Sequence, residues 1–177
     1  MSTVARRRGI GVAMAALIFA ADQYVKWLMI GPLRLREVPS IELLPFFDLR
    51  WTENYGVSLG MLTATSPEMR WLLVAMTSII ALVVCVWMMR ERKLGDILAL
   101  SLVLGGALGN ILDRASKGFV VDYADLHFGT FRPFLIFNIA DAAITIGVLI
   151  ILARSLLSRE KPDAAAPKQA ADAASES

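Results

Sequence analysis

The chain has very little with which to build a metal centre or a disulfide framework. It contains one cysteine, Cys85, and one histidine, His127, in 177 residues. A single cysteine has no partner for an intrachain disulfide, and a single histidine without thiolate partners leaves no ligand set for zinc. We therefore expect neither a disulfide framework nor a zinc site.

Charged residues are also scarce. Only 19% of the residues are charged, 56% are hydrophobic, and the mean hydropathy is +0.59. This balance excludes an ordinary soluble domain, and the length is too short for more than one membrane domain. The composition indicates one small integral membrane protein, whose surroundings are lipid and not nucleic acid.

Four apolar stretches reach the roughly 20 residues that a helix needs to cross the hydrocarbon core. They cover residues 9–30, 71–89, 94–112 and 134–152. Backbone groups cannot stay unpaired in lipid, so each stretch is predicted to be a helix. The first follows three arginines, as a secretory signal would, but it is long, lacks a small-residue cleavage site and precedes three more spans. We predict that it is retained.

Lysine and arginine predict the orientation of these spans. They are concentrated in residues 1–8, 90–93 and 154–168, and segments rich in these residues face the cytoplasm. Both termini are therefore predicted to be cytoplasmic. The segments 31–70 and 113–133 are then extracytoplasmic loops.

Within the first loop, apolar and polar residues alternate over residues 47–52, as in a half-buried strand. The predicted fold is an all-α integral membrane protein with four transmembrane helices and a small extracytoplasmic β-rich loop subdomain. The membrane domain covers residues 9–154 and follows a basic N-terminus, 1–8. Residues 155–177 form a cytoplasmic tail, whose Ala, Ser, Asp and Pro content is typical of disorder.

The polar residues of the spans fall at one depth, the outer boundary of the bilayer. They are Asp22 and Lys26 in the first span, Asn110, Asp113 and Arg114 at the end of the third, Asp122 just beyond it, and Asn138 and Asp141 early in the fourth. The inner halves of the same helices are nearly bare of charge. Because an ionisable group near lipid is costly to keep, it is a functional candidate by default. The distribution indicates a reaction site on one side of the membrane.

Asp122 and Asp141 are the most informative of these residues. Both carboxylates lie in strongly apolar stretches, with amide and guanidinium groups close by in the sequence. Two carboxylates held close together cannot both ionise, so the pair can keep one proton and activate a water. This arrangement suits the hydrolysis of a peptide bond.

Five ordered motifs resemble those of one family, bacterial lipoprotein signal peptidase, also called signal peptidase II. They are DQYVK at 22–26, NYG at 54–56, GGALGNILDR at 105–114, VVDY at 120–123 and FNIAD at 137–141. The resemblance implies an aspartyl endopeptidase of the bacterial inner membrane, with Asp122 and Asp141 as its catalytic pair. Its substrate would be a prolipoprotein, cut before a cysteine that carries a diacylglyceryl group. It also implies that no metal and no organic cofactor is required, and that Asn54, Asn110 and Asn138 line the active site.

The supporting residues have alternative interpretations. Asp22 and Lys26 are four residues apart on one helix face, so they are either part of the site or a structural ion pair. Asp113 with Arg114 could similarly fix a helix end, although the forked donors of Arg114 suit the carbonyls of a substrate backbone. Gly105 and Gly109 have the spacing of a helix-packing pair. We expect Gly106 to leave room for substrate near the scissile bond.

The chain departs from the family pattern at Leu59, where an aromatic residue is usual, and at Tyr123, where phenylalanine is commoner. Two other classes of function stay open. A carrier with an aspartate relay would need ionisable residues on the inner halves, and a noncatalytic scaffold or chaperone would tolerate Asp122→Asn and Asp141→Asn. We expect a monomer, because one bundle supplies every residue of the site.

Overall fold

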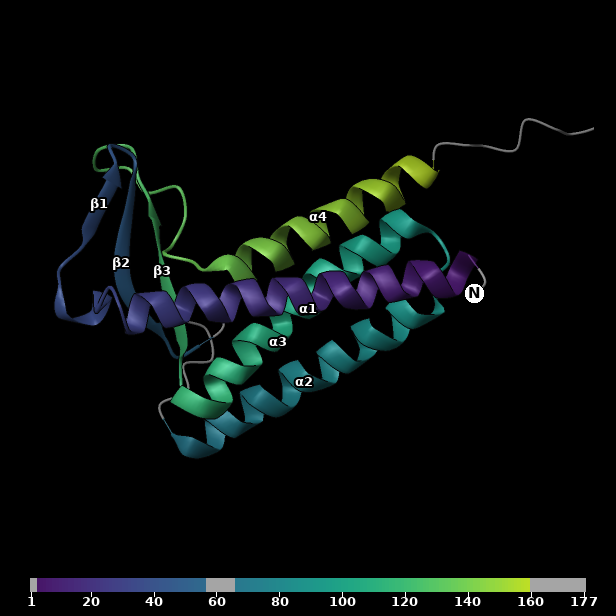
Figure 1. Ribbon diagram of the computed structural model, residues 1–177, viewed down its shortest axis with the longest axis horizontal. Coiled ribbons are helices and arrows are strands. Elements are labelled where there is room, and N and C mark those ends of the chain that lie inside the picture. The colour runs from purple at the N-terminus through teal and green to yellow at the C-terminus, as the bar shows by residue number, and fades with distance from the viewer. Residues whose placement is uncertain (1–2, 57–65, 160–177) are drawn as a thin grey trace, which may run out of the picture.

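Four long helices lie alongside one another in the computed structural model, which describes residues 3–56 and 66–159 (Figure 1). They are α1 (Thr3–Ile30), α2 (Pro67–Arg90), α3 (Leu94–Lys117) and α4 (Ile139–Arg159). Each is long and apolar enough to cross a membrane. The four predicted spans are therefore confirmed. Leu59 and the end of the predicted tail lie outside the described residues.

Five helix ends differ from the predicted ones by four residues or more. α1 begins before residue 9, α2 begins at Pro67 instead of residue 71, and α3 continues past residue 112 to Lys117. α4 begins at Ile139 instead of residue 134 and continues to Arg159, so the first residues of the predicted tail are helical. The late start of α4 has a clear cause, because Phe137 exchanges backbone hydrogen bonds with Ala124 and is held in an extended conformation. Because α3 extends to Lys117, Asp113 and Arg114 lie on the last turns of a helix and not in a loop.

α3 is the central helix and packs against α1, α2 and α4. Its small residues allow the close approaches. A Cβ atom added to Gly105 would lie 2.6 Å from the carbonyl oxygen of Ala15 on α1, and one added to Gly106 would meet the carbonyl oxygen of Ala140 on α4. Helices in lipid associate through this kind of close packing at small residues.

A three-stranded antiparallel sheet lies at one end of the helices (Figure 1). Its strands are β1 (Ile41–Leu44), β2 (Phe47–Asn54) and β3 (Val120–Leu126), in the order β1-β2-β3. β2 confirms the strand that the alternation predicted. In the pairing of β2 with β3, Thr52 lies opposite Asp122, so the sheet sets the position of one candidate aspartate.

An apolar cluster joins this sheet to the end of α1. Met29 of α1, Leu35 of the short 3-10 helix η1 (Leu35–Glu37), Leu49 of β2 and Val121 of β3 are all buried together. Because this cluster includes the residue next to Asp122, the apolar core fixes β3 against the helical bundle.

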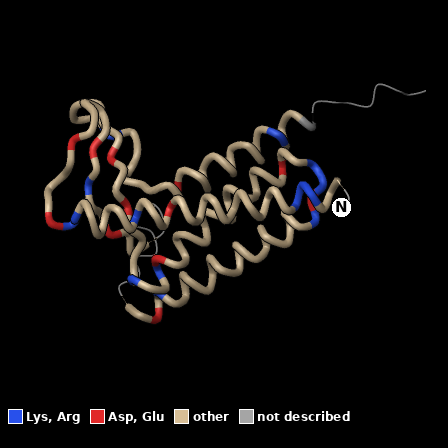
Figure 2. Tube along the Cα trace, viewed as in Figure 1, with Lys and Arg blue, Asp and Glu red and all other residues tan. Residues whose placement is uncertain are grey.

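Charged residues gather at the two ends of the bundle, and the long middle part of the helices carries almost none (Figure 2). One end carries the sheet. The other holds the N-terminal end of α1, the turn between α2 and α3, and the C-terminal end of α4. Arg154 of α4 pairs there with Asp96 of α3. The polar candidate residues are all at the sheet end.

Candidate active site

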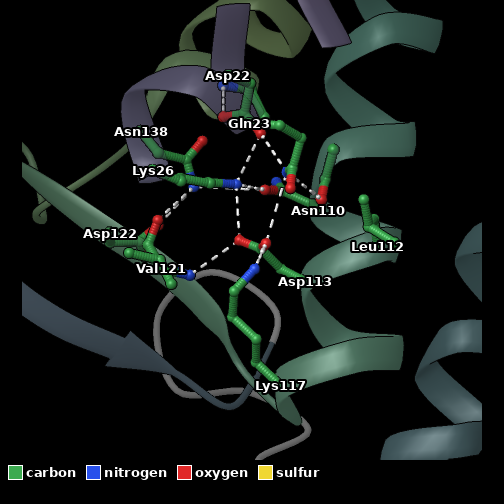
Figure 3. A network of polar contacts seen from close by, with 12 residues as sticks. Asp22, Gln23, Lys26, Asn110, Leu112, Asp113, Lys117, Val121, Asp122 and Asn138 are labelled. Carbon is green, nitrogen blue, oxygen red and sulfur yellow. Dashed lines mark hydrogen bonds and ion pairs between the residues drawn. The ribbon is translucent and has the colours of Figure 1, made fainter. Parts of the chain in front are cut away.

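The sequence candidates meet where α1, α3, β3 and the start of α4 come together (Figure 3). Hydrogen bonds and ion pairs join eight of them into one network: Asp22, Lys26, Asn54, Asn110, Asp113, Asp122, Asn138 and Asp141. Lys26 of α1 is thus brought within bonding distance of Asn110 and Asp113 of α3, more than eighty positions further along the sequence.

Asp122 is held by two side-chain amides. Its Oδ1 accepts a hydrogen bond from Nδ2 of Asn138 at 2.6 Å, and its Oδ2 accepts one from Nδ2 of Asn54 at 3.1 Å. The residue is only 2% exposed. Burial, together with the negative charge of Asp141, raises the pKa of Asp122 to about 7. This carboxyl can therefore hold a proton at neutral pH.

Asp141 is fixed by the way α4 begins. Its backbone N–H donates to Oδ1 of Asn138 at 2.9 Å, and the backbone N–H of Asn138 donates to Oδ2 of Asp141 at 3.3 Å. This reciprocal pair is a capping box in which aspartate takes the place of the usual glutamate. The other oxygen, Oδ1, accepts from Nδ2 of Asn110 at 2.8 Å.

Asn138 connects the two carboxylates, because it bonds to Asp122 through its side chain and to Asp141 through its backbone and its side-chain oxygen. It is 1% exposed. Each aspartate thus receives two hydrogen bonds on its carboxylate, all of them from amide groups. Such donors orient a carboxylate without neutralising it.

Lys26 forms the centre of a buried ion cluster beside the pair. Its Nζ lies 2.9 Å from Oδ2 of Asp22, 2.8 Å from Oδ2 of Asp113 and 3.2 Å from Oδ1 of Asn110. The predicted pairing of Asp22 with Lys26 is confirmed. The predicted partnership of Asp113 with Arg114 is not what the structure has, because Asp113 pairs with Lys26 and, at 2.5 Å, with Lys117.

Arg114 bonds to a peptide carbonyl within its own chain. Its Nη2 donates to the carbonyl oxygen of Gly56 at 2.7 Å, and the N–H of Gly56 donates to Oδ1 of Asn54 at 3.1 Å. Arg114 is therefore linked to Asp122 through the end of β2. This carbonyl belongs to the chain itself, so the binding of substrate carbonyls by Arg114 stays a prediction.

A groove of about 310 Å³ opens beside Asp141 and runs between α2, α3 and α4. Its polar lining comes from Asn54, Thr77, Asn110, Arg114, Asp141 and Thr145, and its apolar lining from Ile80, Val103, Ala107, Ile111 and Ile144. A groove with apolar walls and a few polar groups suits an apolar peptide. The walls can contact its side chains, and the polar groups can bind and polarise one of its backbone carbonyls.

Gly106 has a different position from the one expected. A Cβ atom at this residue would meet the carbonyl oxygen of Ala140 and lie 2.9 Å from the Ile144 side chain. The space beside Gly106 is therefore filled by α4. The residue lets α3 approach the turn that carries Asp141, and this is a packing role.

The described part of the chain contains no group of three or more His, Cys, Asp or Glu side chains placed to hold a metal ion. The single histidine, His127, has its Nε2 atom 3.2 Å from Oδ2 of Asp48 across the sheet. It lies in the β subdomain and takes no part in the polar network around Asp122.

Two network residues were missed by the sequence interpretation. Gln23 donates from Nε2 to Oδ2 of Asp22 at 3.0 Å and to the carbonyl oxygen of Gly109 at 3.3 Å. Lys117 pairs with Asp113, and its spacing of four residues on one helix is a signal that could have identified it. Gln23 lies within the DQYVK motif at 22–26, but nothing in its spacing indicated a role.

Comparison with known proteins agrees with this arrangement. The model of the family described as signal peptidase (SPase) II matches residues 14–157, which include every candidate residue. The chain belongs to the signal peptidase II family. It is 56% identical over 153 residues to the lipoprotein signal peptidase of Rhizorhabdus wittichii, an alignment that covers 86% of this chain and 89% of the relative.

A second relative is similar in sequence to the same degree, and a solved structure is similar in fold. The lipoprotein signal peptidase of Sphingopyxis alaskensis is 53% identical over 162 residues, covering 92% of this chain and 94% of its own. A bacterial membrane enzyme solved at 2.3 Å has a similar structure, with a TM-score of 0.77 and 28% identity over 90% of this chain and 95% of its own. The protein is thus a multi-pass bacterial membrane protein of a protease family.

Proposed function

We propose that this protein is an aspartic endopeptidase that removes the signal peptide from diacylglyceryl-modified prolipoproteins. The cut falls before the lipidated cysteine. The observation that carries the proposal is the placement of Asp122 and Asp141: both contact the same residue, Asn138, and Asp141 lines a groove with apolar walls. The similarity to lipoprotein signal peptidases supports the choice of substrate.

In this mechanism the pair of aspartates retains one proton between them. The ionised carboxylate accepts a proton from a water as the water oxygen attacks the scissile carbonyl carbon, and the protonated carboxyl donates to the carbonyl oxygen. The tetrahedral intermediate then collapses. Its C–N bond breaks as the leaving nitrogen takes up a proton from the pair. One hydroxyl of the intermediate gives its proton to the pair as the new carboxyl group forms, so the two aspartates again hold one proton between them.

The amide side chains orient the pair during these steps. Asn54 and Asn138 hold the two oxygens of Asp122, and Asn110 holds Oδ1 of Asp141. Fixed donors of this kind do not have to reorganise as charge moves, which is the main way that enzymes lower a barrier electrostatically. Arg114 lies on the groove wall and would bind a carbonyl of the substrate backbone.

The groove gives the substrate a position in the membrane. Its apolar wall would take part of the signal helix, and the peptide would unwind near Asp141, because a helical backbone keeps its carbonyls in internal hydrogen bonds. The lipid chains attached to the cysteine would stay in the outer leaflet. The scissile bond and the aspartates then share one depth.

The orientation follows the basic residues. The N-terminal end of α1 and the turn between α2 and α3 lie at the end opposite the sheet (Figure 1). These segments carry Arg6, Arg7, Arg8, Arg90, Arg92 and Lys93, so we place that end and both termini in the cytoplasm. The test is labelling by a membrane-impermeant maleimide in a Cys85→Ala background. A cysteine at Glu42 should be labelled from outside and one at Arg92 should not; the reverse pattern would invert the topology.

Cleavage of a purified prolipoprotein tests the function itself. The protein in detergent should release the signal peptide from a diacylglyceryl-modified substrate, and mass spectrometry should locate the cut immediately before the modified cysteine. The matched control is the same prolipoprotein without the diacylglyceryl group, which should be cut much more slowly. Equal cleavage of both forms, or a cut elsewhere, would refute the proposed specificity.

A further inference from the structure

Two buried carboxylates each bond to the main chain one residue before a proposed catalytic aspartate. Oδ2 of Asp113 accepts a hydrogen bond from the backbone N–H of Val121 at 3.2 Å, and Val121 precedes Asp122. Oδ1 of Asp22 accepts one from the backbone N–H of Ala140 at 3.1 Å, and Ala140 precedes Asp141. The two catalytic segments are therefore held in the same way, by carboxylates from α3 and α1.

A single ammonium group joins these two carboxylates. Nζ of Lys26 lies 2.8 Å from Asp113 and 2.9 Å from Asp22, and its third contact is Oδ1 of Asn110 at 3.2 Å (Figure 3). The three donors of the ammonium are thus all used. The side chains of the three ionic partners are at most 1% exposed.

We propose that Lys26 is a positioning residue for the reaction. Through Asp113 and Asp22 it fixes the main chain before both catalytic aspartates, and so sets the separation at which their carboxylates share a proton. This inference rests on the proposed function. The backbone bonds between Ala124 and Phe137 join the same two segments directly, so the ion cluster adds a second connection between them.

A purely stabilising role explains the cluster poorly. Removing charges from water costs several kcal/mol for each ion, and well-packed apolar side chains often replace a buried ion pair with no loss of stability. Apolar side chains cannot, however, accept hydrogen bonds from two backbone N–H groups. Asp113 and Asp22 do this while each stays bonded to Lys26.

α3 leaves room for one of these carboxylates. A Cβ atom added to Gly109 would lie too close to Oδ2 of Asp22 for both atoms to keep their positions. Gln23 donates to the same oxygen and to the carbonyl of Gly109, which keeps the carboxylate against the helix. Gly109→Ala would therefore displace Asp22 from Ala140 without changing any charge in the cluster.

The test compares Lys26→Met with the wild type and with Arg154→Met. Arg154 joins α4 to Asp96 of α3 at the opposite end of the bundle, so its removal also breaks an ion pair between helices. Lys26→Met should lower kcat by about 100-fold, the effect of a displacement of about 1 Å at a reacting group, with KM little changed. Arg154→Met should keep the wild-type kcat.

All assays are run well below the melting temperature of each variant, so that a loss of folded protein does not count as a loss of kcat. If folded Lys26→Met turns over at the wild-type rate, the positioning role is wrong. If Lys26→Met does not fold, the kinetics of Gly109→Ala and Asp113→Asn test the positioning role in its place. A lower kcat at constant KM in both variants supports the role. A wild-type kcat in either variant overturns it. Failure of the wild type to cleave would instead refute the proposed function.

Discussion

Nδ2 of Asn110 on α3 donates a 2.8 Å hydrogen bond to Oδ1 of Asp141 on α4. Oδ1 of the same amide accepts hydrogen bonds from Nζ of Lys26 at 3.2 Å and from Nδ2 of Asn138 at 3.3 Å. The orientation of this amide is therefore determined, because its oxygen faces two donors and its nitrogen faces a carboxylate. Asn110 is the direct connection between the ion cluster and the aspartate pair.

Asn110→Ala should reduce kcat by about 10- to 100-fold. A hydrogen bond to a charged group contributes about 1.5–3 kcal/mol, and each 1.36 kcal/mol corresponds to about a tenfold change in rate. The matched control is Ser116→Ala on the same helix, since within the described residues Ser116 bonds to carbonyls of its own helix. Steady-state kinetics of the two purified variants make the comparison, and equal rates would remove Asn110 from the site.

Activity should fall as the pH rises above about 7. Burial and the charge of Asp141 raise the pKa of Asp122 to about 7, so raising the pH removes the proton that the pair must donate to the carbonyl oxygen. The measurement is kcat from pH 5 to 9 with one lipidated substrate. A rate that stays constant through pH 9 would contradict a proton shared by this pair.

Asn54→Ala should move the fall in activity to a higher pH. The hydrogen bond from Asn54 to Oδ2 of Asp122 favours the charged carboxylate and so lowers its pKa. Without that bond the remaining activity should fall at a higher pH than in the wild type. A shift of the fall to lower pH would show that Asn54 acts in another way.

Asp122→Asn should increase thermal stability at pH 8 but not at pH 3. In the unfolded chain an aspartate has a pKa of about 3.9, whereas in the fold the pKa of Asp122 is raised to about 7. Ionising Asp122 therefore costs stability as the pH rises between these values, and asparagine avoids that cost. Melting temperatures at the two pH values measure the difference. No gain at pH 8 would mean that the carboxylate is not disfavoured by its surroundings.

Gly106→Ala should lower both the melting temperature and kcat. The added Cβ would meet the carbonyl oxygen of Ala140, so α3 and the first turn of α4 would have to separate next to Asp141. The control is Gly9→Ala on α1, where the structure has nothing within 4 Å of the new Cβ. Alanine in an exposed helix is favoured over glycine by about 0.5–1 kcal/mol, so this control should be at least as stable as the wild type.

Much of the fold could be predicted from the sequence, because lipid imposes strong rules on an apolar chain. Four long apolar runs predicted four helices, and alternation over residues 47–52 predicted β2. The spacing of Asp22 and Lys26 predicted their ion pair. The common depth of the polar residues also indicated that they would gather at one end of the bundle.

Other features depend on contacts that no local pattern encodes. β3 shows no alternation because six of its seven residues are buried, Asp122 and Asp125 included, so its pattern did not indicate a strand. α4 begins late because Phe137 pairs with Ala124, a contact between segments that are distant in sequence. The pairing of Lys26 with Asp113 arises from the packing of α1 on α3 in the same way.

The central claim is that Asp122 and Asp141 together carry out the hydrolysis, and one assay tests it most directly. Cleavage of a diacylglyceryl-modified prolipoprotein is measured for the wild type, Asp122→Asn, Asp141→Asn and the control Asp96→Asn, each shown to be folded by its melting transition. Asp96 lies at the opposite end of α3 and outside the network. We predict that the wild type and Asp96→Asn release the signal peptide and that the other two variants do not. Cleavage at the wild-type rate by either Asp122→Asn or Asp141→Asn would contradict the account.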